Sequence, residues 1–397
     1  MFRATVILAG TALMAACCVI DDETTYYSEE VATVGETVIS PTRTAITIPL
    51  TEQDDTLTSA DERLMDDLWL YAYSLLGDSL SRAVHLTDLQ NVTTPCYVVE
   101  DGDTIATLDY TITDGDTLLT VSTPLDAGMY CLYLIANAGG LTGNNGSSLL
   151  TGEETQDSLE AITVSKEQLL STADEEAKGL IMATKLRDQY VSEGTTSEVE
   201  AALTFACAKL DYTITFDIYD ESHLSFDDDS IKSLYDYYGK TTLTVDSVCL
   251  ERVSARSALA VAGEEDAFLG DTLRINLGTD GVAENGEDSV VITGTCYLPE
   301  RYVSDVDNQT RLRIYGRMTM DGGAPTYNVS YSLVIGGDAT DGKTVNAEDR
   351  TNLGTLRKGN SYQMQAWLGY DNTAYLRLDI VAKAFIEVEE ETVTTDD

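Results

Sequence analysis

The sequence predicts an all-β protein made of two tandem antiparallel β-sandwich domains with minor helix. Short stretches in which apolar and polar residues alternate recur along most of the chain, with turn residues between them. That pattern is typical of antiparallel sandwiches. Asp-Gly pairs at 101–102 and 114–115 bracket the alternating stretch 104–113, and this dipeptide favours hairpin turns because both residues tolerate positive φ. Helical periodicity is limited to 165–182 and 228–240.

The first element is a secretory signal. An apolar run follows Arg3 and ends near Ile20, which makes it shorter than the ~20 apolar residues that a membrane-spanning helix usually needs. Residues 14–17 (MAAC) resemble a bacterial lipobox, in which small residues before a cysteine admit signal peptidase and the thiol receives diacylglycerol. We therefore expect residues 1–16 to be removed as a signal peptide and Cys17 to be lipidated. Cleavage of an ordinary signal peptide is the alternative.

Three acidic residues follow the lipidation cysteine. Asp21, Asp22 and Glu23 resemble the export signal that sends lipoproteins of some Gram-negative anaerobes to the outer face of the outer membrane. Each buried methylene of an acyl chain contributes ~0.8 kcal/mol, and two or more chains make the attachment stable. The N-terminus thus predicts a surface-exposed lipoprotein of the cell outer membrane.

The charge of the chain excludes one class of partner. The chain carries 68 acidic and 24 basic side chains, for a formal net charge of −44. Such a surface repels nucleic acid phosphates, so we expect no nucleic-acid partner. A hydrophobic content of 43% is enough for each domain to form a core, so the chain is not a disordered acidic polymer.

The sequence contains no recognisable catalytic or cofactor motif. His85 and His223 lie outside metal-binding patterns such as HExxH, and no GxSxG, P-loop or dinucleotide fingerprint is present. Residues 227–229 and 305–308 bring several side-chain oxygens together. Their spacing does not match that of a calcium-binding helix-loop-helix motif. We predict no enzyme, no cofactor and no metal site. A carboxylate pair for glycoside hydrolysis is left open, because close acidic pairs are inevitable in this composition.

The cysteines beyond the lipobox are widely spaced. They lack the CxxC-like proximity of zinc and redox sites. In an oxidising compartment, disulfides could form between Cys96 and Cys131 or between Cys249 and Cys296. Buried thiols that behave as small hydrophobes are the favoured interpretation.

The expected strands divide into two groups. The first domain is predicted over 44–187, with strand-like text at 45–50, 68–75 and 117–140, and the second over 188–397. The boundary is placed in the polar segment that begins at residue 188. Four apolar residues are expected in the first core: Trp69, Tyr130, Leu132 and Leu134.

Several motifs, taken in their order along the chain, resemble the fimbrillins, the two-domain transthyretin-like lipoproteins that build type V pili. The lipobox and its acids come first, and "PTRTAITIPL" resembles the segment where fimbrillin precursors are cut after an arginine. The motifs that follow are "DERLMDDLWLYAYSL", "LDAGMYCLYLIANAGG", "GLIMATK", "AALTFACAKLDYTI", "CYLPE" and "LRKGNSYQMQAWL". The pattern departs from the family at residues 204–206, where an arginine is expected, and at residues 358–362.

The resemblance implies a precursor that is cut and then assembled. Cleavage between Arg43 and Thr44 would remove the lipid together with a prosegment, residues 17–43, that contains a first strand at 29–40. Other pilus subunits would be the partners, and the protein would move from the outer membrane to the fimbrium. The resemblance also leaves room for a ligand on a host or bacterial surface.

The C-terminal tail, residues 384–397, is the expected donor strand. Apolar Phe385, Ile386 and Val388 interleave with acids there, as in a strand that enters a vacated groove. The alternative is that the tail is the last strand of its own domain. A second interpretation of the whole chain is a surface glycan-binding lipoprotein of a nutrient-uptake system, for which exposed tryptophans would be sugar platforms. Only Trp69 and Trp367 are available for that role.

Overall fold

The structure is a computed structural model. It describes residues 17–21, 24–27, 43–49, 65–77, 79–89, 96–100, 103–113, 116–143, 146–169, 179–216, 242–260, 272–278, 281–284, 290–319, 326–337, 353–368 and 374–382. Strands dominate these ranges, and the helical segments are the short α1 (Gln156–Glu160), residues 166–169 and the 3-10 helix η3 (Val306–Asn308). The predicted all-β class with minor helix is confirmed. No helix in the described ranges is long and apolar enough to cross a membrane.

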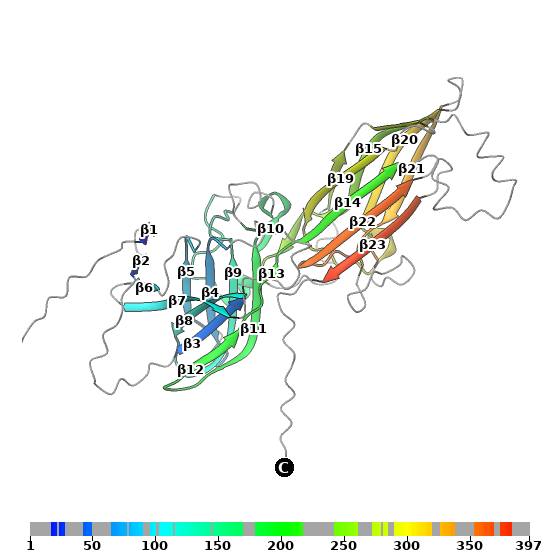
Figure 1. Ribbon diagram of the computed structural model, residues 1–397. Helices are drawn as coiled ribbons and strands as arrows, with labels where there is room; N and C mark the ends of the chain where they lie inside the picture. The colour runs from blue at the N-terminus through cyan, green and yellow to red at the C-terminus, as the bar shows by residue number, and fades with distance from the viewer. Residues whose placement is uncertain are drawn as a thin grey trace, which may run out of the picture.

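The first sandwich pairs a seven-stranded sheet with a five-stranded sheet (Figure 1). In spatial order, the larger sheet contains β1 (Cys17–Asp21), β2 (Thr24–Tyr27), β6 (Cys96–Glu100), β7 (Asp103–Thr113), β8 (Asp116–Pro124), β3 (Arg43–Pro49) and β12 (Thr196–Glu200). The smaller sheet contains β13 (Thr204–Phe205), β11 (Met182–Val191), β9 (Gly128–Ala136), β4 (Leu68–Ser74) and β5 (Ser79–Leu86). Neighbouring strands are antiparallel except β12 and β3, which are parallel.

The core of the first sandwich lies between these two sheets. Ile46 and Val121 from the larger sheet belong to the same buried cluster as Leu70 and Leu134 from the smaller one. Strand β4 of the smaller sheet is buried on both faces, because every residue from Leu68 to Tyr73 is inaccessible to solvent or nearly so. A strand that is buried on both faces has a nearly continuous apolar sequence, which explains the segment "LWLYAYS".

The second sandwich combines a four-stranded and a five-stranded sheet. The first of these contains β19 (Val290–Leu298), β14 (Ala208–Phe216), β22 (Asn360–Leu368) and β23 (Ala374–Ala382). The second contains β17 (Thr272–Gly278), β15 (Thr242–Ser254), β20 (Arg311–Thr319) and β21 (Thr326–Val334), with β18 (Gly281–Glu284) also paired to β15. Leu210 and Met364 from one sheet and Leu250 and Leu312 from the other share a separate buried cluster.

The domain boundary differs from the predicted one. Residues 187 and 188 lie inside β11, and β12 and β13 both belong to sheets of the first sandwich. The polar segment that begins at residue 188 was expected to be a linker. It contains instead the turn from β11 to β12, where Gly194 has a φ of +68°. We therefore propose a boundary between Phe205 and Ala208, where the chain passes from β13 to β14.

A small sheet joins the two sandwiches. Strand β10 (Thr163–Ser165) follows α1 in the first half of the chain, and β16 (Arg256–Ala258) follows β15 in the second. The two strands pair antiparallel, and Leu259 and Ala260, just after β16, belong to the buried cluster of the first sandwich. The sandwiches are therefore linked by backbone pairing and apolar contact as well as by the chain itself.

Candidate functional site

One edge of the seven-stranded sheet is formed by β1 and β2. Strand β2 pairs antiparallel with β6, with Thr25 opposite Val99 and Tyr27 opposite Tyr97, and β1 pairs with β2 in turn. On its other side β6 pairs with β7. Strand β6 is thus paired on both sides only while β2 is present. Unpaired strand edges bind added strands readily, so this edge is a candidate site for assembly.

The predicted cleavage bond lies at the start of a paired strand. Arg43 is opposite Pro124 of β8 and Thr196 of β12, and Thr44 occupies the next register position. A protease binds its substrate as an extended and unpaired chain, so cleavage here requires that the first pairs of β3 open. Cleavage between Arg43 and Thr44 stays a prediction.

The other predicted site residues are only partly described. Cys17 is the first residue of β1, so it lies in the same sheet as Arg43, with β2, β6, β7 and β8 between their strands. Its lipidation stays a prediction. The predicted prosegment strand at 29–40 and the donor residues Phe385, Ile386 and Val388 lie outside the described residues.

Trp69 does not form an exposed platform. Its side chain is 9% exposed, and its ring stacks on His85 with 4.0 Å between ring centroids. It begins a row of rings along β4 that continues through Tyr71 and Tyr73, and Tyr133 of β9 meets Tyr73 edge-on. The predicted burial of Trp69, Tyr130, Leu132 and Leu134 is confirmed.

The disulfides weighed from the sequence are not formed. Cys131, Cys249 and Cys296 are free thiols, and the first two are almost completely buried. Burial raises the pKa of the Cys131 and Cys249 thiols, as expected for small hydrophobic residues in a core. No group of three or more histidine, cysteine or acidic residues within the described ranges is arranged to hold a metal ion.

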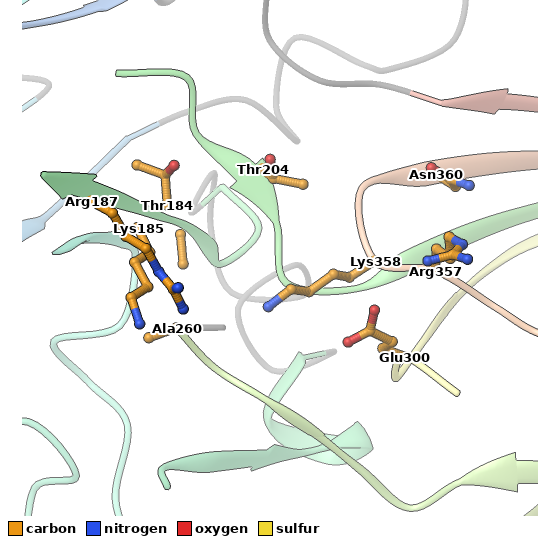
Figure 2. A pocket seen from close by; sticks show the side chains of 10 residues that line it. Thr184, Lys185, Arg187, Thr204, Ala260, Glu300, Arg357, Lys358 and Asn360 are labelled. Carbon is orange, nitrogen blue, oxygen red and sulfur yellow. The ribbon is translucent and has the colours of Figure 1, made fainter. Parts of the chain in front are cut away.

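A cavity that no sequence motif revealed lies where the two sandwiches meet. We call it the junction cavity, and its volume is about 500 Å³. Figure 2 shows it from close by. Its lining residues are Ala183, Thr184, Lys185, Arg187, Thr204, Ala260, Glu300, Arg357, Lys358 and Asn360. The cavity is therefore lined by residues from four of the quoted motifs: "GLIMATK", "AALTFACAKLDYTI", "CYLPE" and "LRKGNSYQMQAWL".

Lys358 connects the sandwiches inside this cavity. Its ammonium group donates to the carbonyl oxygens of Ala258 and Leu259, each at 3.5 Å. Burial lowers the pKa of Lys358 below the ordinary value for lysine, and the charge of Glu300 opposes that shift. The neighbouring Arg357 lies over the ring of Tyr302, 4.2 Å from its centroid.

Lys185 ends in an ion pair at the edge of the same cavity. Its ammonium group is 2.5 Å from the carboxylate of Glu160 in α1, which also accepts hydrogen bonds from Tyr133 and Gln156. Burial by itself would raise the pKa of Glu160. The hydrogen bonds from Lys185, Tyr133 and Gln156 outweigh burial and lower the pKa to about 2.

The depressed pKa of Glu160 predicts a pH dependence of stability. A carboxylate whose pKa is lower in the folded state contributes stability above its unfolded pKa of about 4.3, and that stability is lost as the pH falls toward about 2. We expect Glu160→Gln to reduce stability at pH 6 and to have little effect at pH 2. Urea unfolding at several pH values checks this, with Glu153→Gln as the control because Glu153 is exposed. An equal effect of Glu160→Gln at both pH values would contradict it.

The chain was compared with known proteins. No family model and no curated protein matches the sequence. Solved structures that it resembles include fimbrial and putative cell adhesion proteins. The tip fimbrial protein Mfa3 from Porphyromonas gingivalis, with a C-terminal truncation, is 12% identical with a TM-score of 0.43, over 86% of this chain and 100% of that one.

Two further solved structures are similar over most of both chains. A putative cell adhesion protein from Bacteroides eggerthii is 14% identical with a TM-score of 0.48, over 88% of this chain and 98% of that one. The fimbrial anchor protein Mfa2 from Porphyromonas gingivalis is 11% identical with a TM-score of 0.28, over 87% and 99%.

Proposed function

We propose that the chain is a structural or adhesive subunit of type V fimbriae, exported as a surface lipoprotein and assembled by protease-triggered strand exchange. The observation that carries the proposal is the position of β1 and β2. Both strands lie within the predicted prosegment, 17–43, and they close one edge of the seven-stranded sheet at β6. The ordered fimbrillin motifs of the sequence support the same conclusion.

Cleavage after Arg43 would change this sheet in a defined way. It removes β1 and β2, and it leaves β3 from Thr44 onward between β8 and β12. The backbone groups of β6 that faced β2 then have no partner, and a strand from another subunit satisfies them. A head-to-tail contact of this kind does not close on itself, so it builds a filament. The acidic tail at 384–397 is the proposed donor.

Substitution of a single residue, Cys17, tests the proposed membrane anchor. Cys17→Ala is expected to move the protein from the membrane fraction to the soluble or unprocessed fraction, because the thiol that receives the lipid is missing. Radioactive palmitate labelling and detergent phase partitioning measure the change. Cys18→Ala is the matched control, since Cys18 follows a cysteine rather than a small residue, and it should stay lipidated. Palmitate labelling of Cys17→Ala at the parent level would refute the anchor.

One of the two candidate residues of the glycan-binding alternative is buried. Trp69 is buried in the first sandwich, so it offers no sugar platform in the folded chain. The side chain of Trp367 lies outside the described residues.

A further inference from the structure

Exposed apolar side chains gather at one end of the first sandwich. The described residues include five large apolar side chains that are strongly exposed, and three of these are neighbours: Leu75, Leu76 and Tyr190. Leu75 and Leu76 lie in the turn after β4, where the backbone N–H of Leu75 donates to the carbonyl oxygen of Met129 at 2.9 Å. Tyr190 of β11 is opposite Met129 of β9. We call Leu75, Leu76 and Tyr190 the apolar end.

Packing within the first sandwich does not account for the apolar end. Leu76 is 88% exposed and Tyr190 is 64% exposed. A turn between strands usually takes glycine, asparagine or aspartate, whereas this turn presents two consecutive leucines. Single exposed apolar side chains are normal on a protein surface, but several together mark a contact with a partner or a membrane. The apolar end is therefore a candidate contact surface.

The apolar end points away from the second sandwich. Strand β11 begins at Met182, next to residues that line the junction cavity, and ends at Val191, next to Tyr190. Because a strand rises about 3.3 Å per residue, the end of β11 lies roughly 30 Å from the cavity. Figure 1 shows the turn from β11 to β12 on the side of the first sandwich opposite the second sandwich.

Cys17 lies at the same end of the first sandwich. Strand β8 ends at Pro124, opposite Arg43, and only residues 125–127 separate it from β9, which begins opposite the end of β11. The start of β3 and Tyr190 therefore share one end. The register of the larger sheet brings Cys17 to this end as well, because its row of opposite residues leads to the start of β3 through Tyr26, Val98, Ala106, Thr123 and Thr44.

We propose that the apolar end rests in the surface of the membrane that holds the lipid of Cys17, with Leu75 and Leu76 among the acyl chains and Tyr190 at the headgroups. This contact requires the lipidation of Cys17, so it rests on the proposed function. Leucine suits the hydrocarbon, and tyrosine suits the interface, where its ring is buried and its hydroxyl is wet. The lipid holds the chain at the membrane, and the apolar side chains add buried area that fixes its orientation. The second sandwich then stands away from the membrane.

Fluorescence quenching by brominated lipid tests the contact. The full lipidated chain is placed in vesicles of phosphatidylcholine, a neutral lipid that does not repel the net charge of −44. Leu76→Trp adds a tryptophan at the apolar end. Its fluorescence, measured above that of Trp69 and Trp367 in the parent, is expected to fall when the acyl chains carry bromine. Val306→Trp is the matched control, because Val306 is 64% exposed but belongs to η3 of the second sandwich, and bromine should leave its fluorescence unchanged.

Failure of the contact can be told apart from failure of the lipid anchor. Palmitate labelling of the parent reports on the lipid alone, and a chain that takes up no palmitate would overturn the anchor and the contact together. A labelled chain in which Leu76→Trp is quenched no more than Val306→Trp would overturn the contact and leave the anchor in place. A blue-shifted emission of Leu76→Trp that bromine does not quench would show a second copy of the chain at the apolar end, and would also overturn the contact.

Discussion

Replacing Trp69 by alanine is expected to lower the free energy of unfolding of the first sandwich by about 3–5 kcal/mol. Trp69 is 9% exposed, stacks on His85 at 4.0 Å and lies 5.5 Å from the ring of Tyr71. The substitution removes these contacts and leaves a cavity that the rigid β4 cannot close. Gly152 shows how tightly the ring is covered, because a Cβ at that position would lie 3.3 Å from the indole.

Urea unfolding followed by far-UV circular dichroism measures this loss. Tyr190→Ala is the matched control, because Tyr190 lies in β11 of the same sheet but is 64% exposed. That substitution should change the unfolding free energy by no more than about 0.5 kcal/mol. Similar losses for the two variants would contradict the packing described for β4.

Replacing Arg43 by alanine is expected to abolish protease-triggered polymerisation. Without the cut, β1 and β2 stay in place, β6 stays paired, and no edge is open to another subunit. After incubation with an arginine-specific protease, the variant should remain monomeric by sedimentation. Arg317→Ala is the control, since Arg317 is an exposed arginine of the second sandwich, and this variant should polymerise like the parent. Fibres of Arg43→Ala as abundant as those of the parent would show that this bond is not the trigger.

The fold class could be predicted from the sequence because strand patterning is local. Alternation and Asp-Gly turns mark β7 and β8, and the continuous apolar text of β4 marks a strand that is covered on both faces. The boundary between domains could not be predicted in the same way. The polar residues after β11 are compatible with either a linker or a turn, and only the parallel pairing of β12 with β3, far away in the sequence, decides between them.

The candidate sites depend even more on distant contacts. The motifs that line the junction cavity were recognised one by one, but their meeting place is set by the pairing of β10 with β16 and by the packing of Leu259 into the first core. The edge formed by β1 and β2 at β6 likewise joins residues 70 to 74 positions apart. Such contacts leave no periodic signal in a single sequence.

Electron microscopy of the full chain, before and after treatment with an arginine-specific protease, tests whether the chain assembles by strand exchange. We expect monomers before treatment and fibres afterwards, with subunits whose N-terminal residue is Thr44. Deletion from Glu390 onward should reduce the fibres with little loss of monomer stability, since it shortens the proposed donor strand. Complete cleavage between Arg43 and Thr44 that leaves only monomers would contradict assembly by strand exchange.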